Sequence, residues 1–366
     1  MAVTYAGARI FDGTALRPGG LTVQDGKIAE SAGAETILLD GGYVLPGLLD
    51  LQVNGAGGRM ISGSTTTQDL NAFCDIHARL GATGVLPTLI TDTAQATAAL
   101  IEAAAACRHP GFLGLHLEGP HLDPRRKGAH DPALIRPMVE DDLNRLCDAR
   151  KRLPALLITV APAAVTPEQI ARLSAAGVIV ALGHSECSHD EATAAFAAGA
   201  RAVTHLFNAM SQLGNREPGL AGAAMTQQVQ CGLIADGLHV HPAVMRIALA
   251  ASDRIYLVSD AMAPAGSAIT EFTLGGRRIL RRDGRLTLAD GTLAGADLTL
   301  PQAIANLVRL CGVAPETAFA MASARPAALL GRADLGHLRP GARADFVHLG
   351  PDLSLRGVWR GGERLA

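Results

Sequence analysis

The hydrophobic and polar positions change their spacing along the chain. Between residues 46 and 335, short apolar runs alternate with stretches in which apolar residues recur every three or four positions. The first pattern is typical of buried strands and the second of amphipathic helices. Helical stretches are clearest in TTQDLNAFCDIHARLG, TPEQIARLSAAG and SHDEATAAFAAGA. The apolar runs predict strands at residues 45–54, 84–91, 111–117, 154–161, 177–183, 202–207, 230–236 and 254–260.

Eight such strands with helices between them predict an α/β fold, a (β/α)8 TIM-like barrel. The segment 46–335 has the length that this architecture usually needs. Residues 263–295 are less regular and read as an inserted pair of hairpins. Their pattern does not assign them to the barrel or to another domain.

The two ends of the chain have a different pattern of hydrophobic and polar residues. Residues 1–45 and 336–366 contain short alternating runs separated by Gly-rich turns, several of them with Asp-Gly. Either segment alone would make a poor sheet, whereas the two together would make a stable one. We therefore expect a small β-sandwich domain that is built from both termini.

Composition narrows the class of protein. The 366 residues are 48% hydrophobic and 3% aromatic, so the core must be mainly aliphatic. A net charge of −2 without long charged runs excludes a nucleic-acid or membrane-surface role. Six scattered cysteines without a CxxC pair, no signal peptide and no membrane-length apolar run predict a cytoplasmic protein.

Chemically active side chains recur where the predicted strands end. The active site of a (β/α)8 barrel lies at the carboxyl ends of its strands. One histidine there would be an ordinary structural residue, but each buried polar group without a partner costs about 1–3 kcal/mol. Several such groups at one face therefore predict a site. The strand-end residues are Gln52, Asn54, His116, Glu118, His184, His205, Asn208, Asp236, His239 and Asp260.

Glu118, His184 and His205 are the best candidates to share a cation. Three N and O donors with a fourth position open to water are typical of catalytic zinc sites. Asp260 would lie across the barrel mouth as a base. His116 precedes Glu118 by two residues and lies one layer deeper, where a core-lining role fits at least as well.

Several longer motifs occur in a fixed order between residues 45 and 300, and together they resemble one family. They are PGLLDLQVNGAGG, GLHLEGPHLDPRRKGAHDP, GHSECSHDEATAAFAAGARAVTHLFNAM, GNREPGLAGAA, IADGLHVHP, LVSDAMAPAG and GTLAGADLTL. The set is similar to the N-acetylglucosamine-6-phosphate deacetylases of the amidohydrolase superfamily. The terminal segments also resemble the small β domain of that family.

The resemblance implies a metal site with one ion. Many amidohydrolases carry H-x-H at the end of the first strand, where it holds a second metal, whereas this chain has Gln52 and Asn54. Amides are weaker ligands than imidazoles. One divalent ion per chain is implied, with Zn²⁺ the best match and iron, cobalt or nickel as alternatives. The two amides would fill the vacated space with hydrogen bonds or simply cap the strand end.

The implied reaction is removal of the acetyl group from N-acetyl-D-glucosamine 6-phosphate, in amino-sugar catabolism and recycling. By resemblance, Asp260 is the general base and acid, and His130 polarises the acetyl carbonyl. The substrate-binding positions that match the family are His130, Asn208, Ala209, Arg216 and His239. The family is usually a homodimer, and part of the phosphate site can come from across the interface.

Three other functions compete with this reading. An N-acetylgalactosamine-6-phosphate deacetylase would keep nearly all of these residues. A deacylase of N-acyl amino acids would not need a phosphate-binding Arg216. A non-catalytic scaffold would lose metal ligands or the base, yet this chain keeps all four, Glu118, His184, His205 and Asp260.

Overall fold

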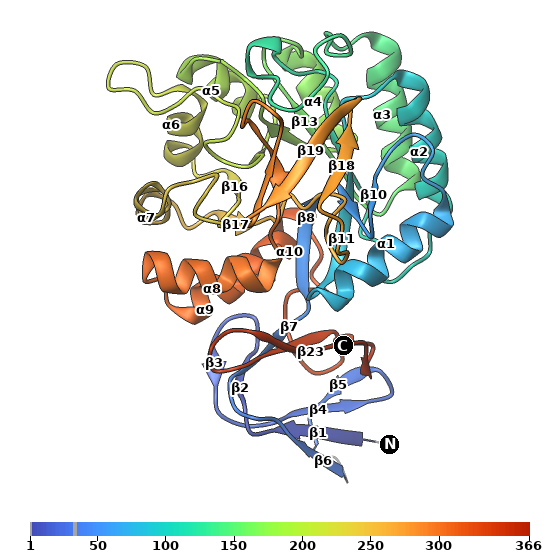
Figure 1. Cartoon of the computed structure of the whole chain (residues 1–366), viewed down its shortest axis with the longest axis vertical. Helices are drawn as coiled ribbons and strands as arrows, with labels where there is room; N and C mark the ends of the chain where they lie inside the picture. The colour runs from blue at the N-terminus through green and yellow to red at the C-terminus, as the bar shows by residue number, and fades with distance from the viewer. Residues whose placement is uncertain (1, 32–34) are drawn as a thin grey trace.

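The structure, a computed structural model, describes residues 2–31 and 35–366. A large α/β barrel is joined to a smaller set of sheets that contains both ends of the chain (Figure 1). The polypeptide leaves the small part through β7 (Tyr43–Pro46) and enters the barrel directly as its first strand. None of the helices in the described ranges combines the length and the apolar character needed to cross a membrane.

Eight parallel strands form the barrel, in the order in which they occur in the sequence. Each strand pairs with the next, and a bridge between Val53 and Ala261 brings the first strand beside the segment that follows the last. The predicted (β/α)8 fold is therefore confirmed. The strands are β8 (Leu48–Val53), β11 (Ala82–Ile90), β12 (Leu115–Glu118), β13 (Leu156–Val160), β14 (Ile179–Leu182), β15 (Ala202–Val203), β16 (Gln230–Leu233) and β17 (Ile255–Leu257).

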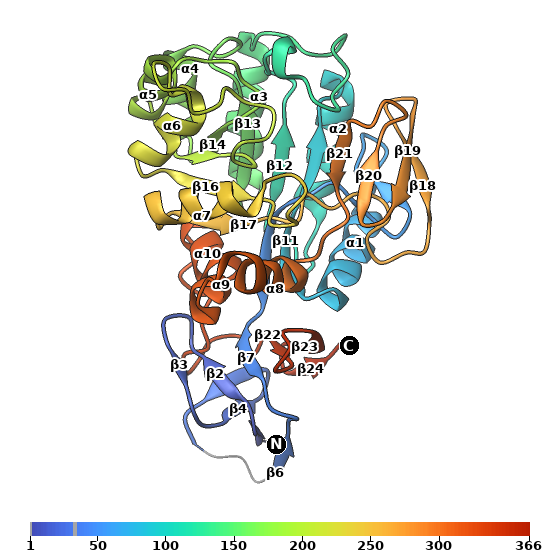
Figure 2. The same cartoon turned by 60° about the vertical axis from the view of Figure 1, so that its left-hand side comes forward.

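The helices lie outside the strands, as Figures 1 and 2 show. Four of the helices have a capping box at their N-terminus. In each, the hydroxyl of the N-cap residue accepts the N–H of the third helical residue. The N-cap residues are Thr66 for α1, Thr166 for α4, Ser188 for α5 and Thr299 for α8. The helices are α1 (Thr67–Arg79), α2 (Ala94–Ala106), α3 (Glu140–Arg152), α4 (Pro167–Ala175), α5 (His189–Ala197), α6 (Gly219–Thr226), α7 (Pro242–Ala251), α8 (Leu300–Cys311), α9 (Pro315–Ala322) and α10 (Ala324–Leu330), with a 3-10 turn, η1 (Pro124–Arg126).

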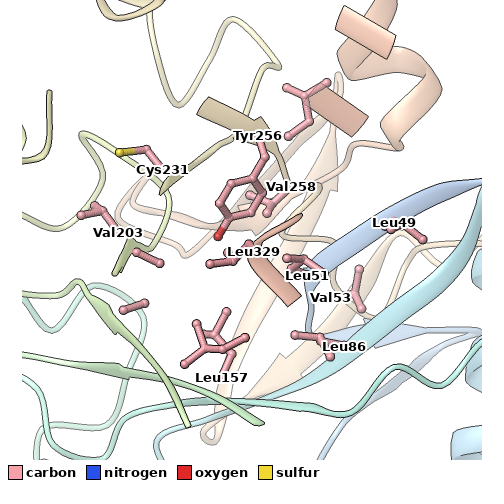
Figure 3. Close-up of a cluster of buried hydrophobic side chains, with 14 of the residues drawn as sticks. Leu49, Leu51, Val53, Leu86, Leu157, Val203, Cys231, Tyr256, Val258 and Leu329 are labelled. Carbon is pink, nitrogen blue, oxygen red and sulfur yellow. The ribbon is translucent and has the colours of Figure 1, made fainter. Parts of the chain in front are cut away.

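Aliphatic side chains hold the barrel strands in place. Leu51, Leu86, Leu157 and Val203, from four different strands, belong to one contiguous buried core, which also contains the aromatic Tyr256 from a fifth strand (Figure 3). Each fully buried aliphatic side chain contributes about 1.5–3 kcal/mol. The low aromatic content thus still gives a rigid base for the strand ends.

Two sheets from the chain ends make the small part of the molecule. The first has the order β5-β4-β1-β6 and the second the order β24-β23-β22-β7-β2-β3. Antiparallel pairing of β22 with β7 joins the C-terminal segment to the N-terminal one, as the sequence predicted. The remaining strands are β1 (Ala2–Ala6), β2 (Arg9–Phe11), β3 (Leu16–Arg17), β4 (Leu21–Gln24), β5 (Lys27–Ala29), β6 (Glu35–Leu38), β22 (Phe346–Leu349), β23 (Leu355–Arg360) and β24 (Glu363–Arg364).

The irregular segment after the last barrel strand is a four-stranded antiparallel sheet. It consists of β18 (Glu271–Leu274), β19 (Arg277–Arg282), β20 (Arg285–Thr287) and β21 (Leu293–Ala296). A bridge between Ala261 and Ala296 holds it beside the barrel, and its own small core packs against Met60, Ile90 and Ala129. The insertion therefore sits on the barrel, beside its mouth (Figure 2), while β9 (Gly55–Ala56) and β10 (Arg59–Met60) form a separate hairpin there.

The small sheets offer a spectroscopic test of their packing. Trp359, the one tryptophan of the sequence, stacks on Phe346 with ring centroids 4.5 Å apart, and Phe346 is fully buried. Phe346→Ala should destabilise this core by about 3–5 kcal/mol, the usual cost of such a truncation. Urea unfolding followed by Trp359 fluorescence should then shift to lower urea. An unchanged transition would contradict this packing.

Candidate metal centre and active site

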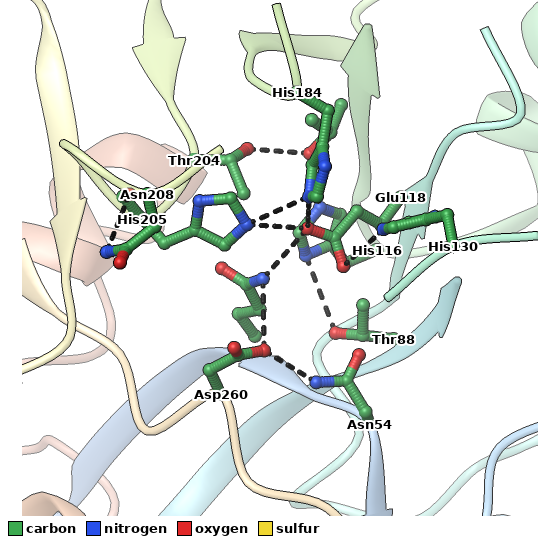
Figure 4. Close-up of polar contacts among 12 residues, drawn as sticks. Asn54, Thr88, His116, Glu118, His130, His184, Thr204, His205, Asn208 and Asp260 are labelled. Carbon is green, nitrogen blue, oxygen red and sulfur yellow. Dashed lines mark hydrogen bonds and ion pairs between the residues drawn. The ribbon is translucent and has the colours of Figure 1, made fainter. Parts of the chain in front are cut away.

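Three side chains from adjacent parts of the barrel rim meet at one point. Glu118 ends β12, and His184 and His205 each lie two residues beyond the end of β14 and β15. Glu118 Oε1 is 2.9 Å from His205 Nε2 and 3.1 Å from His184 Nε2, and the two nitrogens are 3.1 Å apart (Figure 4). All three side chains are buried, and together they could bind a metal ion.

The hydrogen bonds around the cluster fit a cation better than a proton. His184 Nδ1 lies 2.8 Å from the carbonyl oxygen of Arg126, so Nδ1 carries the hydrogen and Nε2 exposes its lone pair. His205 Nδ1 is buried and has no hydrogen-bond partner among the described residues. A proton on His205 Nε2 can bond Glu118 or His184 well, but not both. A metal ion would instead satisfy all three atoms at once.

The charges of the cluster are strongly coupled. Burial alone would raise the pKa of the Glu118 carboxyl, but hydrogen bonds and charge from His184 and His205 hold it well below its usual range. Burial would lower the pKa of His205, and the hydrogen bond and charge of Glu118 outweigh it and raise that pKa. The carboxylate is therefore ionised, as a metal ligand must be.

Backbone strain is concentrated at the same rim. His184, His205 and Asp260 have φ values of 47°, 28° and 51°, in the left-handed region that ordinary residues avoid. Phe207 and Ala209, on the loop after β15, share this conformation with φ of 75° and 48°. Such residues cost about 1–3 kcal/mol each and persist where the surrounding structure demands a special side-chain direction.

Asp260 lies across the mouth from this cluster, three residues beyond β17. Its Oδ1 accepts hydrogen bonds from Asn54 Nδ2 at 2.7 Å and from Gln52 Nε2 at 3.2 Å. Burial, followed by the negative charge of Glu118, raises the pKa of Asp260 to about 6. A carboxyl group whose pKa lies near neutrality can both accept and return a proton.

Gln52, on β8, and Asn54, directly after the end of β8, face the site. Gln52 Nε2 also donates to Glu118 Oε1 at 3.2 Å, and Asn54 Oδ1 is buried with no partner in the part of the chain that the structure describes. Neither amide is merely a cap at the strand end, because both bond side chains from other strands. Gln52 and Asn54 therefore occupy the space beside the cluster and form hydrogen bonds to Glu118 and Asp260.

His130 packs edge-on against His184, with ring centroids 4.3 Å apart. Its Nδ1 accepts the backbone N–H of Thr91 at 3.2 Å, so the proton of the neutral ring sits on Nε2. Burial lowers the pKa of His130 to about 3, and the ring is neutral at physiological pH. His130 Nε2, 3.9 Å from Glu118 Oε2, is thus a hydrogen-bond donor at the site.

A cavity of about 410 Å³ opens over these groups and is large enough for a sugar phosphate. The expected residues Asn54, Glu118, His130, His184 and Asp260 line it. The remaining lining residues are His205, Asn208, Ala209, His239, Arg125, Arg126, Gly128, Ala129, Ile90, Ile234, Met262, Leu274, Thr292, Leu293 and Gly295.

His239 reaches the cavity with a fixed ring orientation. Its Nδ1 lies 2.6 Å from Asp236 Oδ2, and the other oxygen of Asp236 accepts two backbone N–H groups. Both oxygens of Asp236 thus accept hydrogen bonds, and Asp236 fixes the orientation of the His239 ring. Asn208 donates its backbone N–H to the carbonyl of His205, whereas the N–H of Ala209 bonds no other described residue.

Arg216 is the one expected site residue that lies away from the others. Its side chain is exposed, and it is not among the residues that line the cavity. The arginines of the lining are Arg125, which bonds Asp123, and Arg126, which ion-pairs with Glu186.

Sequence reasoning missed several residues of the site. Thr91 fixes His130, and the carbonyl of Arg126 fixes His184, but a backbone contact leaves no pattern in the sequence. The wall formed by Leu274, Thr292 and Leu293 belongs to the insertion. Its place after the eighth strand was a usable signal, because that strand ends at the active face.

Known proteins were compared with the chain as a whole. The Amidohydrolase family matches residues 43–365. The chain is 40% identical over 333 residues to an N-acetylgalactosamine-6-phosphate deacetylase of Shewanella sp. (strain ANA-3), covering 89% of this chain and 84% of that protein. It is 33% identical over 336 residues to an N-acetylglucosamine-6-phosphate deacetylase of Haemophilus influenzae, covering 89% and 87%.

A solved structure agrees with these relatives. The N-acetylglucosamine-6-phosphate deacetylase of Pasteurella multocida superposes with a TM-score of 0.94 at 30% identity, over 100% of this chain and 99% of that one. The barrel and the small sheets thus occur in a shared architecture, and the chain belongs to the amidohydrolase family.

Proposed function

We propose that this protein is a metal-dependent hydrolase that removes the acetyl group from N-acetyl-D-glucosamine 6-phosphate, giving D-glucosamine 6-phosphate and acetate. The observation that carries the proposal is the Glu118–His184–His205 cluster facing Asp260 in one cavity. Relatives named as deacetylases of this sugar phosphate align along most of the chain. The reaction belongs to amino-sugar metabolism.

The three clustered side chains would hold one divalent ion, with Zn²⁺ the best match to one carboxylate and two imidazoles. Iron, cobalt or nickel also accept such ligands. Bound there, the ion would act as a Lewis acid toward the acetyl carbonyl and make water a nucleophile near neutral pH. Because Gln52 and Asn54 are amides, the proposed content is one ion per chain.

Proton transfer is assigned to Asp260. Its carboxylate takes a proton from the attacking water and returns it to the sugar nitrogen as the carbon–nitrogen bond breaks. The amine then leaves in neutral form and the acetyl group leaves as acetic acid, which releases its proton to the solvent and becomes acetate. His130 donates a hydrogen bond from Nε2 to the acetyl oxygen, where negative charge develops.

Substrate binding is assigned to His239, Arg216 and the backbone around Asn208 and Ala209. The unpaired N–H of Ala209 can donate to the sugar or its phosphate. Arginine suits a phosphate because its planar group donates two parallel hydrogen bonds. The exposed Arg216 fits a homodimer in which its loop reaches the cavity of the other subunit.

The chain is proposed to have two domains, with residues 46–335 as the catalytic barrel and residues 1–45 and 336–366 as the small β-sandwich domain. A buried hydrophobic cluster made only of residues from the two terminal segments, among them Tyr5, Phe346 and Trp359, supports this division. Residues 1 and 32–34 lie outside the described residues. The six cysteines are all unpaired, which fits a cytoplasmic protein.

N-acetyl-D-galactosamine 6-phosphate is a second candidate substrate. The specific observation in its favour is the 40% identity to a deacetylase of that sugar. The two sugars differ in the orientation of one hydroxyl group. A buried side chain that bonds this hydroxyl in one sugar would lose its partner in the other, and kcat/KM for the two sugars would then differ by a large factor. Parallel assays on both sugar phosphates decide which is preferred.

The first prediction concerns the reaction and its base. The purified protein should release acetate from N-acetyl-D-glucosamine 6-phosphate, and Asp260→Asn should lower turnover by about 10²–10⁴, the usual contribution of a general acid–base group. Metal content should stay unchanged in the variant. Absence of acetate release by the unaltered protein would refute the proposed function, and near-normal turnover by the variant would remove Asp260 from the mechanism.

The second prediction concerns the metal. Elemental analysis of protein purified without chelator should give about one divalent ion per chain. His205→Ala should lose a ligand and weaken metal binding at least about tenfold, whereas His130→Ala should keep the metal, because His130 bonds Thr91. Two tightly held ions, both needed for activity, would contradict the assignment of one.

The third prediction concerns the phosphate. Arg216→Ala should lower kcat/KM for the sugar phosphate by about 10- to 200-fold, since a hydrogen bond to a charged group is worth roughly 1.5–3 kcal/mol. Unphosphorylated N-acetylglucosamine should be turned over slowly by both proteins, and its kcat/KM should change little. The control is Arg172→Ala, an exposed arginine paired with Glu140, which should behave as wild type. Equal losses on both substrates would show that Arg216 does not read the phosphate.

A further inference from the structure

Three polar residues on β8 and directly after its end point to the same side of the chain. Asp50, Gln52 and Asn54 are spaced by two, so their side chains share one face. All three are buried, with 1–2% of their surface exposed. A buried strand rarely carries such a row unless each group has a partner.

The partner of the row is the short segment 259–261. The carboxylate of Asp50 accepts the N–H of Ser259, at 3.1 Å to Oδ1 and 3.2 Å to Oδ2. The N–H of Asp260 donates to the carbonyl of Gln52 at 3.0 Å, and the N–H of Asn54 donates to the carbonyl of Ala261 at 2.7 Å. The whole row is therefore joined to the residues on either side of Asp260.

The two amides of the row bond one oxygen of the Asp260 side chain and not the other. Gln52 Nε2 and Asn54 Nδ2, which are donors, both reach Oδ1. The described residues give Oδ2 no hydrogen bond, and Asp260 lines the cavity. The left-handed backbone of Asp260, with φ of 51°, is thus fixed from both its main chain and its side chain.

We propose that Asp50, Gln52 and Asn54 are positioning residues, which hold the backbone and the Oδ1 atom of Asp260 so that Oδ2 is the atom that transfers the proton. In this arrangement the proton moves from water to Oδ2 and from Oδ2 to the leaving nitrogen. Hydrogen bonds to a charged oxygen are short and strong, and two of them on one atom leave the carboxylate a single rotamer. The inference rests on the proposed function, because it assigns an atom to that reaction.

Competing roles for the row predict different behaviour. If the amides served only to close the barrel, their loss would lower stability. Their loss would then reduce kcat by the same factor in the wild-type protein and in the Asp260→Asn variant. If they position Asp260, their loss would matter only while Asp260 acts as the base. A double-mutant cycle separates these cases.

The experiment measures kcat, KM and metal content for Asn54→Ala in two backgrounds, wild type and Asp260→Asn. Asn54 makes the shorter bond to Oδ1 and has no hydrogen bond to Glu118. In the wild-type background, kcat should fall by about 10- to 100-fold while KM stays within about threefold. In the Asp260→Asn background, the same substitution should cause no further loss, and the metal should remain bound in every variant.

Two additional variants protect the reading of the result. Asn54→Leu keeps the shape of asparagine without its donor, so it should repeat the effect if Asn54→Ala folds poorly. Asn71→Ala, on α1 and outside the cavity lining, is the matched control and should leave kcat unchanged.

The possible outcomes separate this inference from the proposed function. An active wild-type protein whose kcat survives Asn54→Ala and Asn54→Leu would overturn the inference alone. A loss of equal size in the Asp260→Asn background would also overturn it, since the effect would then not pass through Asp260. A wild-type protein that releases no acetate would overturn the proposed function, and the inference with it.

Discussion

The whole site depends on one electrostatic constraint, which is that a carboxylate oxygen and two imidazole nitrogens are held about 3 Å apart in a buried place. Removing these groups from water costs free energy, and the hydrogen bonds of a shared proton offset only part of that cost. A cation offsets more of the desolvation cost, because each of the three ligand atoms forms a bond to it. The cavity, the base and the donor His130 are all arranged around this point.

The barrel satisfies the constraint through its strand ends. Parallel strands place the ends of β12, β14 and β15 at the same rim, with β13 between β12 and β14, and a left-handed backbone at His184 and His205 turns both rings inward. Backbone groups then fix the rings, as the carbonyl of Arg126 does for His184 and the N–H of Thr91 does for His130. The strain at the rim is offset by the aliphatic core between the strands.

The sequence predicts the parts of this arrangement that follow from periodicity. All eight barrel strands, the cluster of Glu118, His184 and His205, and the pairing of the chain ends could be inferred from it. Strand lengths could not: β15 has two residues, because the left-handed turn at His205 ends the ladder early. The exposed position of Arg216 and the shared oxygen of Asp260 also depend on three-dimensional contacts that leave no sequence pattern.

The central claim is that one divalent ion binds Glu118, His184 and His205 and that the amide pair holds none. Anomalous diffraction at the zinc edge, from crystals grown with Zn²⁺, tests it most directly. The account predicts one strong peak within bonding distance of Glu118 and the Nε2 atoms of the two histidines. An ion between Gln52 and Asn54, or no ion at the three clustered atoms, would contradict it.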